Sequence, residues 1–288
     1  MFDSLLNFLL HGYLSPTPLF LFLFVIATSL LTLLAVSCYL HRSQTHGAVL
    51  YLAPLNHIFR FTLWIMTGMV TKEWVAVHRK HHAKCDTPED PHSPLYFGLR
   101  KILLEGADIY RKAGENNPKL MEEYGKGTPD DWVERNVYAG RFRNYGVRIT
   151  LVIELVLFGL PALIIWPIQM LIIPIIAAGF INGIAHVYGY QRYKDGTPRG
   201  DGKVFERIGS ARNVPTYGLA VGEEFHNNHH AYQGNYKFSH AWYEFDLAGT
   251  FTELLTWIGF AWVPRRVKVE EKKEQQLAPL PPRGITVS

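Results

Sequence analysis

Residues 78 to 82 read His78-Arg-Lys-His81-His82, and this stretch decides how the rest of the chain is interpreted. The same spacing recurs at His226-Asn-Asn-His229-His230, and two more histidines frame His41-Arg-Ser-Gln-Thr-His46. These three boxes hold eight of the thirteen histidines in the chain. Neutral imidazole is the commonest metal ligand and suits iron, zinc and copper. Because a closed structural zinc site takes only four ligands, the boxes predict a shared centre with more than one metal ion.

The spacing within the boxes indicates which histidines can converge. On a helix, residues i, i+3 and i+4 share a face, so the three histidines of each HxxHH box can meet. His41 and His46 lie about 140° apart on an ideal helix, so either they bind different metals or one lies past the helix end. Another histidine, His186, follows Asn182 by four residues at the end of an apolar segment. We interpret His186 as a ninth ligand and Asn182 as the holder of a metal-bound water.

The boxes contain neither carboxylates nor thiols, which argues against calcium, magnesium and iron–sulfur sites. Iron and zinc remain, with copper less favoured. Hydrolysis would require a carboxylate base within the motif, as in HExxH, so an all-imidazole site beside apolar segments favours O2 activation. Carboxylates outside the boxes are candidates for orienting the imidazoles, namely Asp86, Asp90, Glu223 and Glu224. Among the remaining histidines, we expect His57 to be a hydrogen-bonded structural residue, His92 to shape the loop below the second box, and His11 and His240 to be surface or structural residues. We expect no disulfide between a buried Cys38 and an exposed Cys85.

Long apolar runs point to a membrane protein. Residues 19–40 carry no charge, and as a helix of about 33 Å they are long enough to cross a bilayer. Residues 149–187 are long enough for two spans, with Pro161 and Pro167 as plausible bends. Residues 49–70 are apolar but contain Asn56, His57 and Arg60, which are costly at mid-bilayer. If that segment crossed, the first two boxes would lie on opposite faces, so we predict an interfacial or re-entrant helix.

These segments predict an all-α integral membrane fold of about three to four transmembrane helices with a helical cytosolic cap that carries the histidines. The expected parts are an N-terminal lead-in (1–18), a membrane domain (19–262) and a disordered tail (263–288). Within the membrane domain we expect spans near 19–40, 149–166 and 168–187, an interfacial helix near 49–70, and a cap made of 71–148 and 188–262. Residues 128–131, Thr-Pro-Asp-Asp, predict the start of a helix, and residues 197–222 predict loops.

The distribution of basic residues predicts the orientation. Residues 71–148 contain 14 Lys and Arg and residues 188–288 contain 13, whereas residues 1–40 contain none. The positive-inside rule then places the boxes on the cytoplasmic face. The basic face favours acidic partners such as lipid head groups, a phosphate-bearing substrate or an acidic electron carrier, and we find no nucleic-acid-binding module.

Four motifs together resemble the integral-membrane fatty acid desaturases, in particular the acyl-CoA (stearoyl-CoA-like, delta-9) branch of bacterial type. They are YLHRSQTH (39–46), EWVAVHRKHHAKCDTPEDPHSP (73–94), NGIAHVYGY (182–190) and GEEFHNNHHAY (222–232), and the resemblance extends over about residues 19–262. It implies a mushroom-like fold in a bacterial inner membrane and a centre of two non-haem Fe2+ ions. The implied ligands are His41, His46, His78, His81, His82, His186, His226, His229 and His230, with Asn182 acting through water. Trp74 is a candidate wall of the acyl tunnel, and an interfacial aromatic anchor is an equally good interpretation.

The resemblance also implies the reaction. Two hydrogens leave adjacent methylenes of a saturated long-chain acyl-CoA, one O2 and two electrons are consumed, and a cis double bond forms, often at carbon nine. The electrons would come from a separate donor such as a ferredoxin, a rubredoxin or a cytochrome b5-like protein with its reductase, since the chain has no CxxCH and no GxGxxG. Alternatives that share the centre are a desaturase of phospholipid-bound or carrier-bound chains and a di-iron lipid hydroxylase. Alternatives of another class are a His-rich membrane metal transporter and a bis-histidine haem protein.

Overall fold

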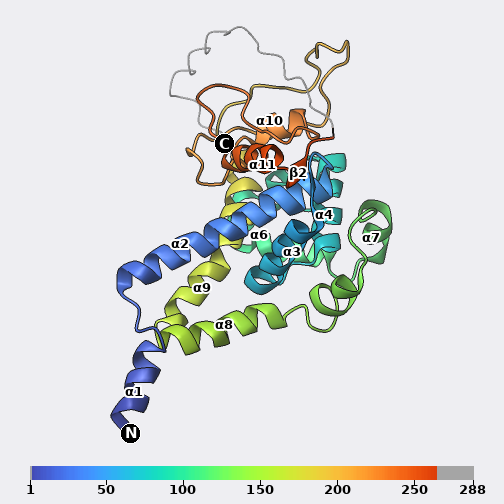
Figure 1. The fold of residues 1–288 in the computed structure, drawn as a ribbon. Helices are drawn as coiled ribbons and strands as arrows, with labels where there is room; N and C mark the ends of the chain where they lie inside the picture. The colour runs from blue at the N-terminus through green and yellow to red at the C-terminus, as the bar shows by residue number, and fades with distance from the viewer. Residues whose placement is uncertain (1, 265–288) are drawn as a thin grey trace.

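The computed structural model describes residues 2–264, which are mostly helical and contain one two-stranded sheet (Figure 1). Two long apolar rods dominate. The first is α2 (Pro18–Leu34), which continues directly into the wider-wound η1 (Ala35–Thr45). The second is α9 (Ala162–Ile173), which continues through η3 (Pro174–Ile181) to the short turn η4 (Ile184–His186). By length and composition both rods can cross a membrane, as expected for residues 19–40 and for the end of the second apolar block.

The apolar block 149–187 turns beside Pro161, one of its two predicted bends, and not at Pro167. We expected helices over 149–166 and 168–187, but α8 (Tyr145–Phe158) ends earlier and Pro167 lies inside α9. The chain turns at Gly159, whose φ of +67° is accessible to glycine without strain. Gly159 packs so closely on Gly12, after α1 (Phe2–His11), that a Cβ on Gly159 would lie 2.6 Å from the Gly12 nitrogen. Because α8 is only about 21 Å long, it is too short to cross the bilayer core of about 30 Å as a straight helix.

The segment expected to lie in the interface forms α3 (Ala53–Thr67), which packs against α8 and η1. Its polar residue Arg60 is buried and paired. The Arg60 guanidinium donates to both oxygens of Asp131, at 2.6 and 2.9 Å, and to Glu134 at 2.9 Å. Two carboxylates of the cap therefore compensate the charge of Arg60, which binds α3 to the cap.

The cap contains the remaining helices and the sheet. They are α4 (Thr71–Lys84), α5 (Pro94–Phe97), α6 (Leu99–Gly114), α7 (Pro118–Tyr124), η2 (Glu134–Tyr138), α10 (His226–Ala231), α11 (Leu247–Trp257), β1 (Leu50–Tyr51) and β2 (Ala261–Trp262). The predicted helix start at 128–131 is confirmed, because Asp131 accepts a hydrogen bond from the Glu134 amide. Residues 197–222 form turns and isolated bridges, also as predicted. Most of the expected disordered tail, 265–288, lies outside the described residues.

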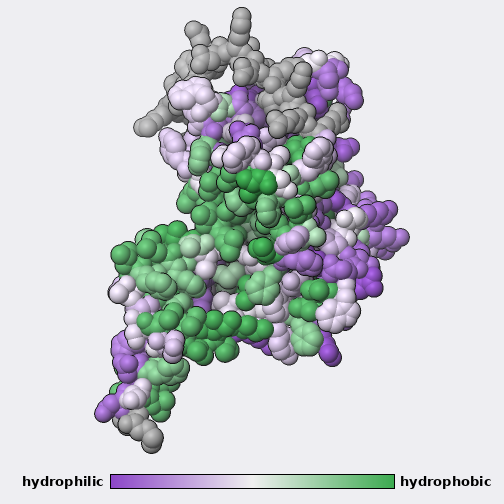
Figure 2. Space-filling model, in the orientation of Figure 1, coloured by the Kyte–Doolittle hydropathy of each residue, from purple (hydrophilic) through white to green (hydrophobic). Residues whose placement is uncertain are grey.

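The position of the core follows from this arrangement. The largest group of buried apolar side chains surrounds η1 and includes Tyr39, Leu40, Phe59 and Leu63. Figure 2 shows an apolar surface over α2, α8 and α9, and a polar surface at the right, around α7. The end of the first rod thus lies where the apolar helices meet the polar cap, and the first histidine box lies at that end.

Candidate metal centre

Nine histidines from four parts of the chain meet in two adjacent groups. The five-histidine group contains His41, His46, His78, His82 and His229, and the four-histidine group contains His81, His186, His226 and His230. Within each group, one ring nitrogen from every member lies within 4.8 Å of the others. Eight of the nine side chains are buried, and His46 is half-buried. Every histidine of the three boxes is used, together with His186.

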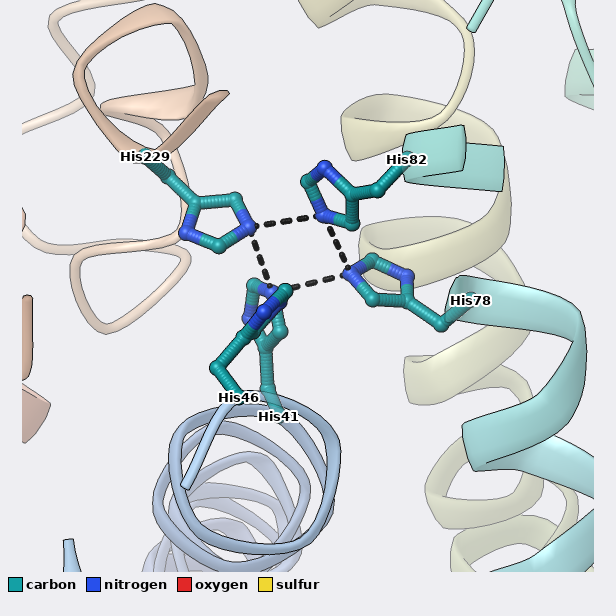
Figure 3. Close-up of side chains that lie close together, drawn as sticks. All are labelled: His41, His46, His78, His82 and His229. Carbon is teal, nitrogen blue, oxygen red and sulfur yellow. Dashed lines mark hydrogen bonds between the residues drawn. The ribbon is translucent and has the colours of Figure 1, made fainter. Parts of the chain in front are cut away.

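The side chains of the five-histidine group point toward one another (Figure 3), and their nitrogen separations are those of a metal site. The Nε2 atoms of His41, His78, His82 and His229 lie at the four corners of a square-like arrangement, with successive separations of 2.9, 3.0, 2.9 and 2.9 Å. The centre of a flat square with such edges lies about 2.1 Å from each corner, which is close to a metal–imidazole bond length of about 2.0–2.1 Å. The fifth side chain, His46, has a buried Nε2 without a hydrogen-bond partner.

Hydrogen bonds between the histidines cannot by themselves account for this arrangement of four Nε2 atoms. Each Nε2 of a neutral imidazole has either one proton or one lone pair, yet each contacts two others. His41 is fixed further, because its Nδ1 donates to Glu223 at 2.5 Å, which leaves only a lone pair on Nε2. A cation at the centre would satisfy all these lone pairs together. The donor set therefore fits a metal ion.

His41 and His46 belong to the same group, although an ideal helix would separate them. The reason is that the rod widens into π-type turns over η1, where hydrogen bonds run from residue i+5 to residue i. The amide of His46 donates to the carbonyl of His41, and His46 caps the helix. Of the two possibilities left open by the spacing, the structure has His46 just past the helix end, and it excludes separate groups for the pair.

The four-histidine group is more open. Its Nε2 separations are 2.9 Å between His186 and His226, 3.1 Å between His226 and His230, and 3.4 Å between His81 and His230. Asn182 ends η3 four residues before His186 and lines the same cavity as His226. This group therefore has one imidazole fewer and an amide nearby.

Hydrogen bonds on the far side of the rings orient several imidazoles. His81 donates through Nδ1 to both oxygens of Asp90, at 3.0 Å each, and the His186 Nδ1 lies 3.0 Å from the Ser210 hydroxyl. Of the four expected carboxylates, Asp90 and Glu223 therefore contact imidazoles directly. Asp86 acts at one remove, by accepting the Ser210 amide at 2.6 Å. Glu224 instead accepts the amides of Gly218 and Gly222 and supports a loop.

The local electrostatics keep Glu223 and Asp90 charged and favour the neutral form of five of the histidines. Burial by itself would raise the pKa of Glu223, but His41 and Arg42 outweigh it and hold that pKa at about 2. In the same way His81 overcomes burial and keeps the pKa of Asp90 well below its ordinary value. Burial, reinforced by neighbouring imidazoles, lowers the pKa of His78, His82, His226, His229 and His230 far below the usual range. Neutral imidazole is the form in which histidine binds metals, and carboxylates such as Glu223 and Asp90 orient metal-binding imidazoles.

Comparison with known proteins agrees with this geometry. The family model for fatty acid desaturases matches residues 16–255. This chain belongs to the fatty acid desaturase family.

Among its relatives is the palmitoyl-monogalactosyldiacylglycerol delta-7 desaturase of Arabidopsis thaliana, 26% identical over 80% of this chain and 57% of the relative. An acyl-CoA 5-desaturase of Anemone leveillei is 27% identical over 77% of this chain and 64% of the relative. The sn-1 stearoyl-lipid 9-desaturase of Synechocystis is 29% identical over the same shares. The match thus spans about three fifths of these relatives' length. The names of these relatives include both acyl-lipid and acyl-CoA desaturases.

For a member of this family, the cavity beside the histidines is of special interest. A cavity of about 420 Å³ is lined by His41, His78 and His226, and so reaches both groups. Its other walls are mostly apolar, from α3, α4, α6 and the second rod, and include Met66, Val70, Met170, Ile173, Ala177 and Ile181. Trp74, the candidate tunnel residue, lines this cavity and stacks on His78 with ring centroids 4.9 Å apart.

A second cavity, of about 430 Å³, reaches the five-histidine group from the polar side. His46 and His82 form part of its lining, together with Arg79, Arg207 and Gln233. Arg79 is held in place because its guanidinium donates to the carbonyls of Gln44 and Thr45. Different sides of the five-histidine group therefore face an apolar and a polar space.

Several residues differ from expectation. Cys85, expected to be exposed, is half-buried with its Sγ 3.8 Å from the His230 Nδ1, because the loop at Ile208 covers it. His92, expected only to shape a loop, is fully buried and stacks on His81 with centroids 4.3 Å apart. His57 is exposed rather than structural, since it lies on the outer face of α3. His240, as expected, is structural, with its ring close to the Tyr193 hydroxyl and to Asn235.

Sequence reasoning missed Arg42, which lies inside the first box. Its side chain is completely buried, stacks on Phe238, and pairs with Glu223 at 2.6 Å and with both oxygens of Asp246 at 3.0 Å. An arginine directly after a ligand-type histidine, on a helix leaving an apolar segment, was the available signal. Arg42 connects the carboxylate that orients His41 to the start of α11.

Proposed function

We propose that this chain is an O2-dependent desaturase that introduces a cis double bond, at carbon nine, into a saturated long-chain acyl-CoA. The observation that carries the proposal is the apolar cavity, which brings space for an acyl chain against histidines of both groups. A closed structural metal site has no use for such a space, whereas a reaction on a methylene requires it. Membership of the desaturase family supports the same reaction.

Two non-haem iron ions, held by the nine histidines with Asn182 acting through water, would supply the O2 chemistry. The residues of the chain then have distinct tasks. Glu223 and Asp90 keep protons on the Nδ1 atoms of His41 and His81, so that the Nε2 lone pairs face inwards, and the Ser210 hydroxyl lies against the Nδ1 of His186. The apolar walls exclude water from the reacting methylenes and fix which of them faces the centre. Trp74 holds His78 by stacking and forms part of that wall.

Basic side chains at the cavity support a substrate with a phosphate-bearing head group. Arg111 and Arg143 line the cavity together with Asn144, and Arg143 is positioned by a two-pronged pair with Glu73 at 3.0 and 3.2 Å. Coenzyme A and phospholipids both carry phosphate. We place acyl-CoA first, because these arginines lie outside the two apolar rods, and acyl lipid second.

The electrons would enter from the polar side. The second cavity reaches His46 and His82, and Arg79 and Arg207 give it a positive lining. An acidic carrier such as a ferredoxin, a rubredoxin or a cytochrome b5-like protein fits that charge. With the boxes on the cytoplasmic face, the carrier would be a soluble cytoplasmic protein.

The test is expression of the unmutated chain and of His229→Ala in a host without its own desaturase, with the acyl profile measured by gas chromatography–mass spectrometry. We expect a new cis-monounsaturated acid only with the unmutated chain. Sorting the product by pool, acyl-CoA against phospholipid at early times, identifies the head group. Hydroxylated lipid would instead assign the hydroxylase reaction. Purified chain without iron would overturn the oxygen-activating centre.

A further inference from the structure

The end of the cap presents apolar side chains to the outside. We call this surface the α11–β2 patch; its residues are Leu50, Leu52, Leu254, Trp257, Ile258, Phe260 and Trp262. Trp257 is 84% exposed and Trp262 is 66% exposed. The patch is continuous across the small sheet, because Leu50 pairs with Trp262 and the Leu52 amide donates to the Phe260 carbonyl at 3.1 Å.

No charged residue interrupts the patch. Between residues 247 and 262 the only charged residue is Glu253. Its carboxylate turns away to Lys237, at 3.2 Å, and to the Tyr236 hydroxyl, at 2.9 Å. An uncharged surface with two nearly bare tryptophans is unusual for a part of a protein that faces only water, and such surfaces mark interaction sites.

The inner face of α11 fixes the level of the patch. Ala248, Thr252 and Leu255 are buried, and Thr252 lies 3.0 Å from the Tyr51 hydroxyl. The Cys38 Sγ lies 3.9 Å from both the Ala248 carbonyl and the Thr252 hydroxyl. Cys38 belongs to the first apolar rod and precedes His41 by about one helical turn. The patch therefore lies beside the end of that rod, where the apolar surface of the molecule meets the polar cap.

We propose that the α11–β2 patch is embedded in the membrane–water interface and anchors the cap to the bilayer. Trp is enriched at this level of membrane proteins, because the indole ring is apolar on its faces and polar at its N–H. Leu52 of the patch directly precedes α3, on which Ile58 and Phe61 are exposed, so the patch is joined along the chain to a helix already expected to contact lipid. It also means that residues 247–262 are interfacial, in contrast to the cytosolic cap expected over 188–262.

The anchor has a mechanical connection to the histidines. Asp246 caps the start of α11 by accepting the Gly249 amide at 2.7 Å, and it pairs with Arg42 next to His41. A bilayer that holds α11 therefore also holds the residue network beside the five-histidine group.

The test uses tryptophan fluorescence of the full chain in nanodiscs, and it needs no turnover. Lipids carrying bromine near the head groups quench indoles at the interface, and aqueous iodide quenches indoles in water. We compare the unmutated chain with Trp257→Phe/Trp262→Phe. The matched control is Trp132→Phe, which removes a 70% exposed tryptophan beside Asp131. Gel filtration and thermal melting establish that the variants are folded.

We expect the double variant to lose bromolipid-quenched emission and to keep its iodide-quenched emission, and Trp132→Phe to do the reverse. Loss of iodide-quenched emission from the double variant would overturn the proposal, because the patch would face water. Loss of emission that neither quencher reaches would also overturn it, because protein, such as a second copy of the chain, would then cover the patch.

Discussion

Replacing Glu223 by glutamine tests whether hydrogen bonding at Nδ1 controls the metal-binding atom of His41. One Glu223 oxygen accepts from His41 at 2.5 Å, and the other accepts from the Ser37 hydroxyl and from Arg42 at 2.6 Å. If the amide NH2 of glutamine faces His41, Nδ1 must become the acceptor and the proton moves to Nε2. If the NH2 faces Arg42, two donors oppose each other in a buried space, at a cost of about 1–3 kcal/mol.

The first orientation is cheaper for the fold and harmful to the site, because a protonated Nε2 has no lone pair for a metal. Loss of such a supporting partner typically weakens metal binding about 10–100-fold, or about 1.4–2.8 kcal/mol. Arg42 keeps its two hydrogen bonds to Asp246, so we expect Glu223→Gln to fold. The four-histidine group does not contact Glu223 through a ring nitrogen, and its metal should stay.

The assay is iron per chain after timed dialysis against a chelator, measured by plasma mass spectrometry. Glu223→Gln should lose one iron well before the other. Glu224→Gln is the matched control, since Glu224 is a buried neighbour whose bonds go to the amides of Gly218 and Gly222. The reasoning is refuted if Glu223→Gln keeps both irons as long as the unmutated chain does, or loses both at the rate of Glu224→Gln.

Three further predictions follow from other contacts. Asp90→Asn should release the iron of the four-histidine group first. The backbone amides of Asp86 and His92 donate to the two Asp90 oxygens, so the NH2 group of asparagine would face one of these N–H donors. Equal retention of both irons would contradict this. Ala177→Phe should shift the products towards shorter chains by filling the apolar cavity, whereas Ile175→Phe, on the exposed side of η3, should not; identical profiles by mass spectrometry would count against the cavity as the acyl site. Burial, with Arg192 nearby, lowers the pKa of His240 to about 3, so between pH 3 and 6.5 the unfolded chain binds more protons than the folded chain. The stability that is present above pH 6.5 is therefore lost as the pH falls, by at most about 1.4 kcal/mol per pH unit. His240→Gln should therefore have a shallower fall in melting temperature from pH 7 to 5, and parallel curves would show that His240 does not contribute.

The ligands of the candidate metal centre show how much of the site can be predicted from the local sequence. Ligand-type residues are recognisable because imidazoles at i, i+3 and i+4 must share a helical face whatever surrounds them. Asp90 and Glu223 could be named as hydrogen-bond partners of the imidazoles because they lie close to a box in the sequence. The partner role of Ser210 was not visible, because it depends on a loop that folds over His186 from 24 residues away.

Sequence by itself determined that the chain has apolar rods, that three histidine boxes lie beside them, and that these boxes belong together, since local periodicity and charge follow from the order of residues. Tertiary structure decided how the nine histidines divide, because the division depends on the widened winding of η1 and on which rings face each other across elements. It also decided that the chain between α8 and α9 turns at Gly159 beside Pro161, and not at the other predicted bend, Pro167, because the end of α1, nearly 150 residues earlier, packs on Gly159. The α11–β2 patch could not be predicted from the sequence. A short apolar helix and strand have the same sequence pattern whether they are buried in protein or lie against lipid, and only the tertiary packing shows which face is exposed.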